Sequence, residues 1–213
     1  MATYDFKKEY KGLYLPKSGP GIVDVPEMLF LMVDGKGDPN TAAAYQQALE
    51  ALYGLSYTIK MSKMGPVQPE GYFDYVVPPL EGLWRTADGN EFDGSKPGDK
   101  DRLCWTSMIR QPAFVTEAAL ASARAALAKK KPGVDTSIVR LCAFTEGLCV
   151  QMLHVGPYDD EPATVAQMKA FVAAEGYRED FSNARTHHEI YMGDPRKTVP
   201  EKLKTILRHP VAI

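Results

Sequence analysis

The sequence predicts an α+β fold, a duplicated strand-helix-strand-strand module that forms two antiparallel sheet halves with helices on one side. Two observations lead to this prediction: a strand-turn-helix pattern that occurs twice, and short segments in which polar and apolar residues alternate. We expect a single domain over residues 1–213, with repeats at roughly 25–115 and 140–213. A central ligand cleft is expected where the two halves meet.

The repeated pattern begins in residues 29–41 and again in residues 150–162. Each stretch reads as a strand, a glycine turn and a proline before a helix. The turn glycines, Gly35 and Gly156, are separated by nearly the same number of residues as Gly54 and Gly176, which are expected to end the helices. The two halves are therefore expected to share one topology.

Apolar residues three or four positions apart predict the helices. The expected helices span residues 41–54, 116–131 and 162–176. Asn40 is the expected cap of the first helix. Alternating residues predict strands at residues 73–77, 103–109 and 187–192, and the polar stretch from Thr86 to Asp101 reads as a long hairpin loop.

Composition excludes several classes of protein. The 213 residues include 25 Lys and Arg and 27 Asp and Glu, a formal net charge of -2, so there is no electrostatic signature of nucleic-acid binding. No apolar run is long enough to span a membrane. The three cysteines form no CxxC pair, which is typical of reduced thiols in a cytoplasmic protein. The oligomeric state is not indicated.

No cofactor or metal site is expected. The Gly35-Lys-Gly-Asp-Pro-Asn40 turn lacks the third glycine of a dinucleotide fingerprint. The stretch 88–93 begins like a calcium loop, but Phe92 stands at a ligand position. His187 and His188 are adjacent in an expected strand, so their side chains point to opposite faces and cannot bind one ion.

The strand at 187–192 carries the most distinctive chemistry. Alternation places His187, Glu189 and Tyr191 on one face and Ile190 on the other. If the Ile190 face packs on the helices, Glu189 projects into the cleft, where a carboxylate among aromatic rings either gains a raised pKa or awaits a cation. The alternative is an exposed sheet face on which Glu189 pairs with a lysine.

Aromatic residues are the candidate walls of the site. Tyr75, Trp84 and Trp105 lie on expected strands or at their ends, and Tyr158 follows the second strand-turn. Walls of this kind around one acid suit a flat, lipophilic and in some cases cationic small molecule. Core packing is the alternative interpretation of both tryptophans.

Several segments together resemble the stand-alone branch of the GyrI-like small-molecule-binding proteins. They are Asp24-Val-Pro-Glu-Met28, Val33-Asp-Gly-Lys-Gly-Asp-Pro-Asn40, Pro78-Pro-Leu-Glu-Gly-Leu-Trp84, Met108-Ile-Arg-Gln-Pro112, Leu153-His-Val-Gly-Pro-Tyr-Asp-Asp-Glu-Pro162, His187-His-Glu-Ile-Tyr191 and Asp194-Pro-Arg196. The resemblance spans nearly the whole chain. It implies the fold of the effector domains of multidrug-sensing activators, in which an acidic residue matching Glu189 meets cationic drugs. Fewer than thirty residues precede the first repeat strand, so we expect no DNA-binding module.

For the stand-alone branch, the resemblance implies hydrolysis of the strained cyclopropane in cyclopropanoid DNA-alkylating compounds, a detoxification. Glu189 is then the candidate general base, and Tyr158 or Tyr191 donates a hydrogen bond to the developing oxyanion. Trp84, Trp105 and Tyr75 are expected to stack on the substrate.

Arg85 stands where a second aromatic residue often follows the tryptophan in this family. Two functional hypotheses remain open at this stage. The first is a cyclopropanoid hydrolase, and the second is a non-catalytic module that binds or sequesters multidrug-type effectors.

Overall fold

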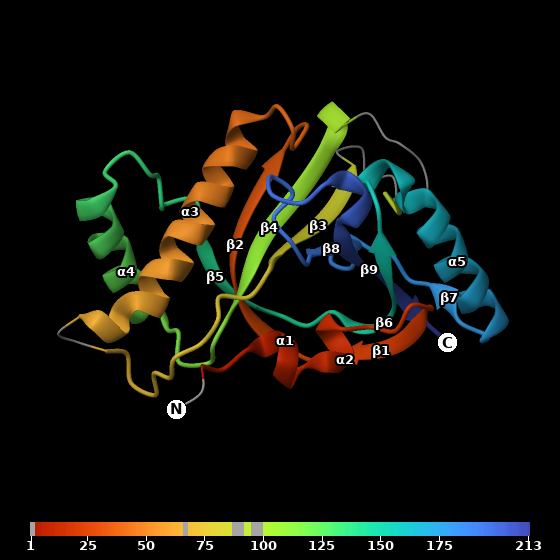
Figure 1. The fold of residues 1–213 in the computed structure, drawn as a ribbon, viewed down its shortest axis with the longest axis horizontal. Coiled ribbons are helices and arrows are strands. Elements are labelled where there is room, and N and C mark those ends of the chain that lie inside the picture. The colour runs from red at the N-terminus through yellow and green to blue at the C-terminus, as the bar shows by residue number, and fades with distance from the viewer. Residues whose placement is uncertain (1–2, 66–67, 87–91, 95–99) are drawn as a thin grey trace.

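The computed structural model describes residues 3–65, 68–86, 92–94 and 100–213 (Figure 1). The strands are β1 (Gly21–Val25), β2 (Met28–Lys36), β3 (Leu80–Thr86), β4 (Leu103–Gln111), β5 (Arg140–Phe144), β6 (Gly147–Val155), β7 (Arg178–Glu179), β8 (His187–Tyr191) and β9 (Lys204–Ala212). The α-helices are α1 (Phe6–Glu9), α2 (Lys11–Tyr14), α3 (Ala43–Lys60), α4 (Glu117–Lys130) and α5 (Glu161–Ala174), and η1 (Met61–Met64), η2 (Lys100–Arg102), η3 (Tyr158–Asp160) and η4 (Pro200–Lys202) are short 3-10 turns. None of the described helices is long and apolar enough to cross a membrane.

The strands form one antiparallel sheet of nine strands, which confirms the predicted fold class. Its order is β1-β6-β9-β8-β3-β4-β2-β5, with β7 paired to β9. The two halves have the same topology. Exchanging β1 with β5, β2 with β6, β3 with β8 and β4 with β9 gives the same strand order read in reverse. Each half begins with a strand that pairs in the other half, β1 with β6 and β5 with β2. The halves meet where β3 pairs with β8.

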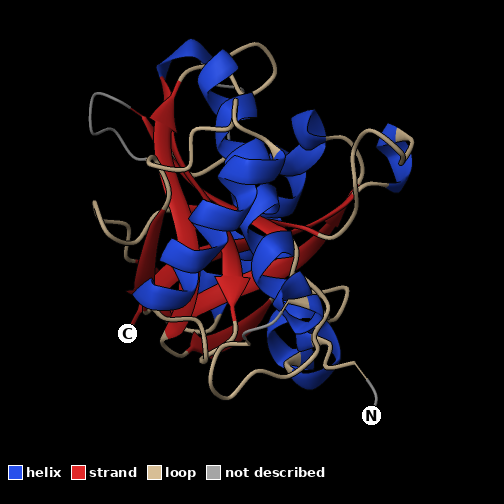
Figure 2. Ribbon diagram, turned by 90° about the vertical axis from the view of Figure 1, so that its left-hand side faces the viewer, coloured by secondary structure: helices blue, strands red, loops and turns tan. Residues whose placement is uncertain are grey.

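The long helices α3, α4 and α5 share one face of the sheet, where α3 and α5 flank the central strands (Figures 1 and 2). The prediction of helices on one side holds for these three. The short helices α1 and α2 lie on the opposite face, where Leu13 and Tyr14 pack with Phe30, Met108 and Ile190. Strand alternation separates the two faces, so neighbours such as Ile206 and Leu207 enter different clusters.

Some element boundaries differ from those predicted. Helix α3 continues past Gly54 to Lys60, because this glycine serves helix packing: a Cβ there would lie 2.9 Å from the Leu127 side chain of α4. The residue before α3 is Ala42, with no side-chain cap, so Asn40 does not cap the helix. Asn40 instead belongs to the Asp38 turn, and donates two hydrogen bonds to the Asp38 carboxylate.

Two further predictions concern loops. The 73–77 segment forms only an isolated bridge, Tyr75 with Tyr4, because it runs beside the N-terminal segment and outside the sheet. The predicted Thr86–Asp101 loop lies largely outside the described residues, as does the calcium-like stretch except for Phe92 and Asp93. Strands β3 and β4, which the loop joins, pair as expected of a hairpin, with Trp84 opposite Trp105.

A fully buried charged cluster supports the centre of the sheet beneath α2. It consists of Glu81, Glu146, His188 and Arg208. The His188 ring lies 3.0 Å from Glu146 through Nδ1 and 3.1 Å from Glu81 through Nε2. Arg208 donates to Glu146 at 2.8 Å, and the Tyr14 hydroxyl donates to Glu81 at 3.1 Å. Two carboxylates thus face two cations, a balance that makes burial tolerable.

The cluster predicts a bounded pH range of maximal stability. Burial alone lowers the pKa of His188, but Glu146 raises it from 6.5 to about 9. The contribution of His188 to the free energy of unfolding is therefore complete below pH 6.5 and is lost as pH rises through about 9. Burial alone raises the pKa of Glu146, but His188 and Arg208 lower it from 4.5 to about 2. The contribution of Glu146 to the free energy of unfolding is complete above pH 4.5 and is lost as pH falls through about 2. Urea denaturation across this range should show a plateau between pH 4.5 and 6.5, and a stability that rises steadily toward pH 9 would contradict it.

Candidate functional site

Glu189 lies on β8 at the centre of the sheet, opposite Gly82 of β3. Its side chain points to the face that carries α3 and α5, whereas Ile190 packs on the α2 side. Helices α3 and α5 therefore cover the face of the sheet that carries Glu189. The expectation that the Ile190 face packs on these helices is wrong. Glu189 is only 8% exposed, so it does not sit on an open sheet face, and His187 approaches it at 3.2 Å.

A second buried carboxylate, Glu161, approaches Glu189 from the first turn of α5. One of its oxygens is buried and has no hydrogen-bond partner among the residues that the structure describes. Burial and the charge of Glu189 raise the pKa of Glu161 well above its ordinary value. The sequence did not indicate Glu161 as a site residue, because it ends an acidic run, Asp159-Asp-Glu161, typical of an exposed helix start. The signal present was its position three residues after Tyr158.

Three tyrosines surround the carboxylate pair. Burial and the Glu189 charge raise the pKa of Tyr158 to about 12 and also raise the pKa values of Tyr45 and Tyr191 above the ordinary value. The Tyr158 and Tyr191 rings meet edge to face with centroids 5.9 Å apart. All three hydroxyls therefore keep their protons at neutral pH and remain hydrogen-bond donors. Tyr45, on α3, is a site residue that the sequence did not indicate.

Trp84 joins this group from β3. Its indole Nε1 donates to the Tyr191 hydroxyl at 3.1 Å. The contact passes over Gly82, where a Cβ would lie 2.8 Å from the Trp84 Nε1 and 3.2 Å from the Tyr191 hydroxyl. Arg85, the next residue, lines a cavity with Leu83 on the opposite face and so points away from Trp84.

The structure does not bring the other two predicted wall residues to Glu189. Trp105 is 1% exposed and packs over Gly35, with its ring edge to face with Tyr45 at 4.9 Å between centroids. It supports Tyr45 from behind. Tyr75 is fully buried among Phe6, Phe73 and Phe114, beside the N-terminal helices.

His187 and His188 face opposite sides of the sheet, as alternation predicts. His187 meets Glu189 and His209, and His188 meets Glu81 and Glu146. Among the described residues, Glu161, His187 and Glu189 place one ligand-type atom each within 4.8 Å of one another. Both ring nitrogens of His187 are already engaged, however, so a cation would have to break an existing contact. The arrangement is accounted for by hydrogen bonding and does not define a metal centre.

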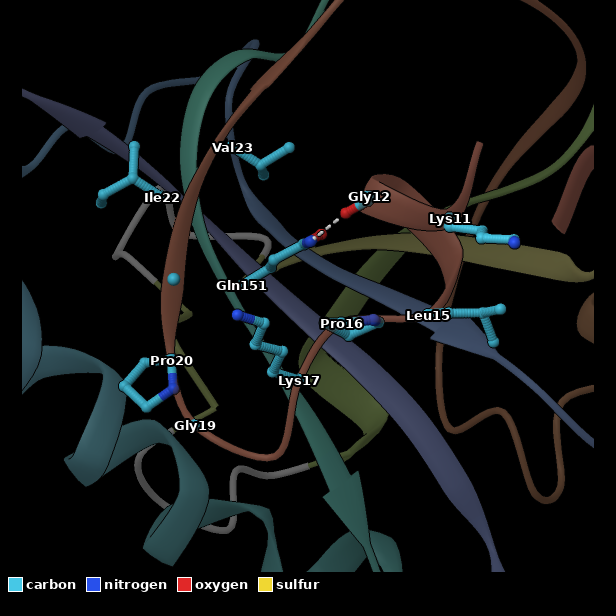
Figure 3. A pocket seen from close by; sticks show the side chains of 11 residues that line it. Lys11, Gly12, Leu15, Pro16, Lys17, Gly19, Pro20, Ile22, Val23 and Gln151 are labelled. Carbon is cyan, nitrogen blue, oxygen red and sulfur yellow. Dashed lines mark hydrogen bonds between the residues drawn. The ribbon is translucent and has the colours of Figure 1, made fainter. Parts of the chain in front are cut away.

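Two surface cavities lie among the residues that the structure describes, and neither is the predicted central cleft. One, of about 370 Å³, lies between α2 and β1 and is lined by residues that include Lys17, Ile22 and Gln151, whose amide donates to the Gly12 carbonyl (Figure 3). The other, of about 430 Å³, lies on the same side of the sheet near Arg85 and Arg140. Neither is lined by Glu189, which is 8% exposed.

Comparisons with known proteins agree with this architecture. The model of the GyrI-like small molecule binding domain matches residues 20–212. A hydrolase from Listeria innocua is 53% identical, with a TM-score of 0.90, and the alignment covers 99% of this chain and 100% of that chain. An uncharacterized conserved protein from the same organism is 55% identical, with a TM-score of 0.92 and the same coverage.

A more distant structure shows the fold alone. The EcmrR C-terminal domain is 12% identical, with a TM-score of 0.51, and the alignment covers 91% of this chain and 96% of that domain. The search of curated proteins gave no match. The family match over residues 20–212 and the end-to-end similarity to the Listeria proteins agree with the resemblance seen in the sequence, and this chain belongs to the GyrI-like small-molecule-binding domain family.

Proposed function

We propose that this protein is a hydrolase that binds flat, lipophilic electrophiles and opens the strained ring of cyclopropanoid DNA-alkylating compounds. The observation that carries the proposal is the pair of buried carboxylates, Glu161 and Glu189. Two carboxylates this close do not ionise together easily, and the raised pKa of Glu161 assigns it the proton. One acid and one base at neutral pH suit a hydrolysis.

The chemistry follows from these two roles. A water oxygen bonds to the ring carbon while Glu189 takes its proton. The cyclopropane C–C bond breaks, and its electron pair moves through the conjugated dienone to the carbonyl oxygen. The carbonyl oxygen becomes a phenol hydroxyl by taking a proton from Glu161. Tyr158 or Tyr191 donates a hydrogen bond to the negative charge that develops on this oxygen. Trp84 and Tyr45 supply apolar surface for the flat ring system.

Two further points support a hydrolase. A relative 53% identical over its full length is itself called a hydrolase. The closed setting of Glu189 also favours chemistry, because excluding bulk water strengthens the fields of the carboxylates and tyrosine hydroxyls. Tyr158, at 36% exposure, marks the edge of the site and the expected route of entry.

A second candidate is a non-catalytic module that binds or sequesters multidrug-type ligands. It is favoured by the position of Glu189 among three tyrosines and Trp84, since such a group also stabilises a lipophilic cation. In this case Glu189 neutralises the ligand charge and activates no water.

The experiment that separates the two is incubation of the pure protein with a cyclopropanoid dienone alkylator. Ring-opened product is followed by chromatography, with binding measured in parallel. Several turnovers per protein are the expected result of the hydrolase. Tight binding without product identifies the binding module, and neither binding nor product removes this substrate class.

A further inference from the structure

A line of side chains leads from Glu189 to the protein surface. Glu189 Oε1 lies 3.2 Å from His187 Nε2, and His187 Nδ1 lies 2.8 Å from His209 Nε2. His209 Nδ1 lies 3.1 Å from Glu179 Oε1. Both histidine side chains are completely buried, whereas that of Glu179 is 27% exposed. Four residues from β8, β9 and β7 thus join the closed site to solvent.

The surroundings hold the two rings in this line. Phe92 packs edge to face on His187 at 5.5 Å, and Phe181 does so on His209 at 5.0 Å. A Cβ at Gly94 would lie 2.8 Å from His187 Cε1, so the backbone there closes directly over the ring. Both nitrogens of each ring are used within the line.

With both carboxylates ionised and both imidazoles neutral, the line is one proton short of three hydrogen bonds. Each of the three contacts requires one proton. Two neutral imidazoles bring one proton each, and two ionised carboxylates bring none. A proton accepted by Glu189 therefore completes the line.

We propose that His187, His209 and Glu179 form a proton relay that carries the proton accepted by Glu189 to the surface. The proposal rests on the proposed function, in which Glu189 takes a proton from water at each turnover. All three relay residues act through Glu189, and none touches the substrate.

One passage along the line conserves atoms and charge. The proton on Glu189 Oε1 moves to His187 Nε2, the proton on His187 Nδ1 moves to His209 Nε2, and the proton on His209 Nδ1 moves to Glu179. Three bonds to hydrogen break and three form. Glu179 then releases its proton to water. The passage leaves both rings protonated at Nε2, so each ring must return to its Nδ1–H form before the next passage, and Glu161 takes from water the proton that it gave to the phenol.

Titratable and charged groups face both ends of the line. Glu161, Tyr158 and Tyr191 face Glu189, while Lys169 approaches Glu179 at 3.7 Å and also contacts Asp93. Burial lowers the pKa of His209 to about 4, although its hydrogen bond to Glu179 opposes that shift. His209 therefore passes the proton on and does not retain it.

The first test needs no substrate. Histidine nitrogen shifts are recorded by NMR on the ligand-free protein between about pH 3 and about pH 9, a range that includes the His209 pKa of about 4. The relay predicts that His187 and His209 change in one joint step, because coupled groups share a macroscopic pKa. Glu179→Gln should move that step to lower pH for both rings, since a negative charge is lost. Rings that keep fixed tautomers, or a His187 that ignores Glu179→Gln, would overturn the relay.

The second test uses turnover. Glu179→Gln should lower kcat about tenfold with KM unchanged, a modest part of the factor that acid–base catalysis supplies. Glu179→Asp should recover most of it, and Glu175→Gln, an exposed glutamate in the turn after α5, is the matched control. An unchanged kcat in Glu179→Gln would contradict the relay. If the unaltered protein turns over no substrate, the proposed function fails, and the NMR result still decides whether the line shares a proton.

Discussion

Replacing Glu189 by glutamine is expected to abolish measurable turnover of a cyclopropanoid substrate. Removing a positioned general base lowers kcat by roughly 100-fold to 10,000-fold. KM should change little, because a glutamine keeps the volume of the side chain and can still donate to His187 Nε2. Glu175→Gln, exposed and remote from the site, is the matched control. The measurement is steady-state formation of the ring-opened product by each variant.

The same variant separates the two candidate functions when binding is also measured. In a hydrolase, Glu189→Gln leaves the affinity for neutral and cationic flat ligands mostly intact. In a binding module, it weakens the binding of cationic dyes and spares neutral ones, because the carboxylate then serves only to balance charge. A Glu189→Gln variant that retains wild-type turnover would show that Glu189 is not the base.

The feature of the site most easily predicted from the sequence was which side chains of β8 share a face of the strand. Because side chains alternate strictly along a strand, the separation of His187 and Glu189 from His188 and Ile190 followed directly from the residues, and the structure shows it. The identity of the covering helices did not follow, since a sheet of this kind carries helices on both faces and the sequence does not say which set lies over Glu189.

Contacts between distant segments were inaccessible for a different reason. His209 is 22 residues from His187 and 30 from Glu179, and only the pairing of β8 and β7 with β9 brings them together. Glu161 was hidden in an acidic run whose exposure cannot be told from composition. Tyr75 was expected in the pocket wall but is buried in the core, because a large aromatic residue near a strand more often packs in the core than lines a pocket.

The other large effect concerns stability. Arg208→Met is expected to lower the free energy of unfolding by about 3–5 kcal/mol, the usual result of removing one partner of a buried ion pair. The change leaves Glu146 with His188 as its remaining cation and deprives the Gln151 carbonyl and Leu13 carbonyl of their donor. Arg140→Met is the control, because Arg140 forms an exposed pair with Asp34 and should cost less than about 1 kcal/mol. Urea denaturation of both variants gives the comparison.

A double variant shows whether charge balance is the reason. Arg208→Met alone leaves two buried carboxylates, Glu81 and Glu146, facing the single cation His188. Adding Glu146→Leu removes the excess negative charge and leaves His188 paired with Glu81. The double variant should therefore be more stable than Arg208→Met, since replacing a complete buried pair by apolar groups costs far less than breaking it. A double variant that is less stable than Arg208→Met would mean that packing around the arginine, and not its charge, holds the centre of the sheet.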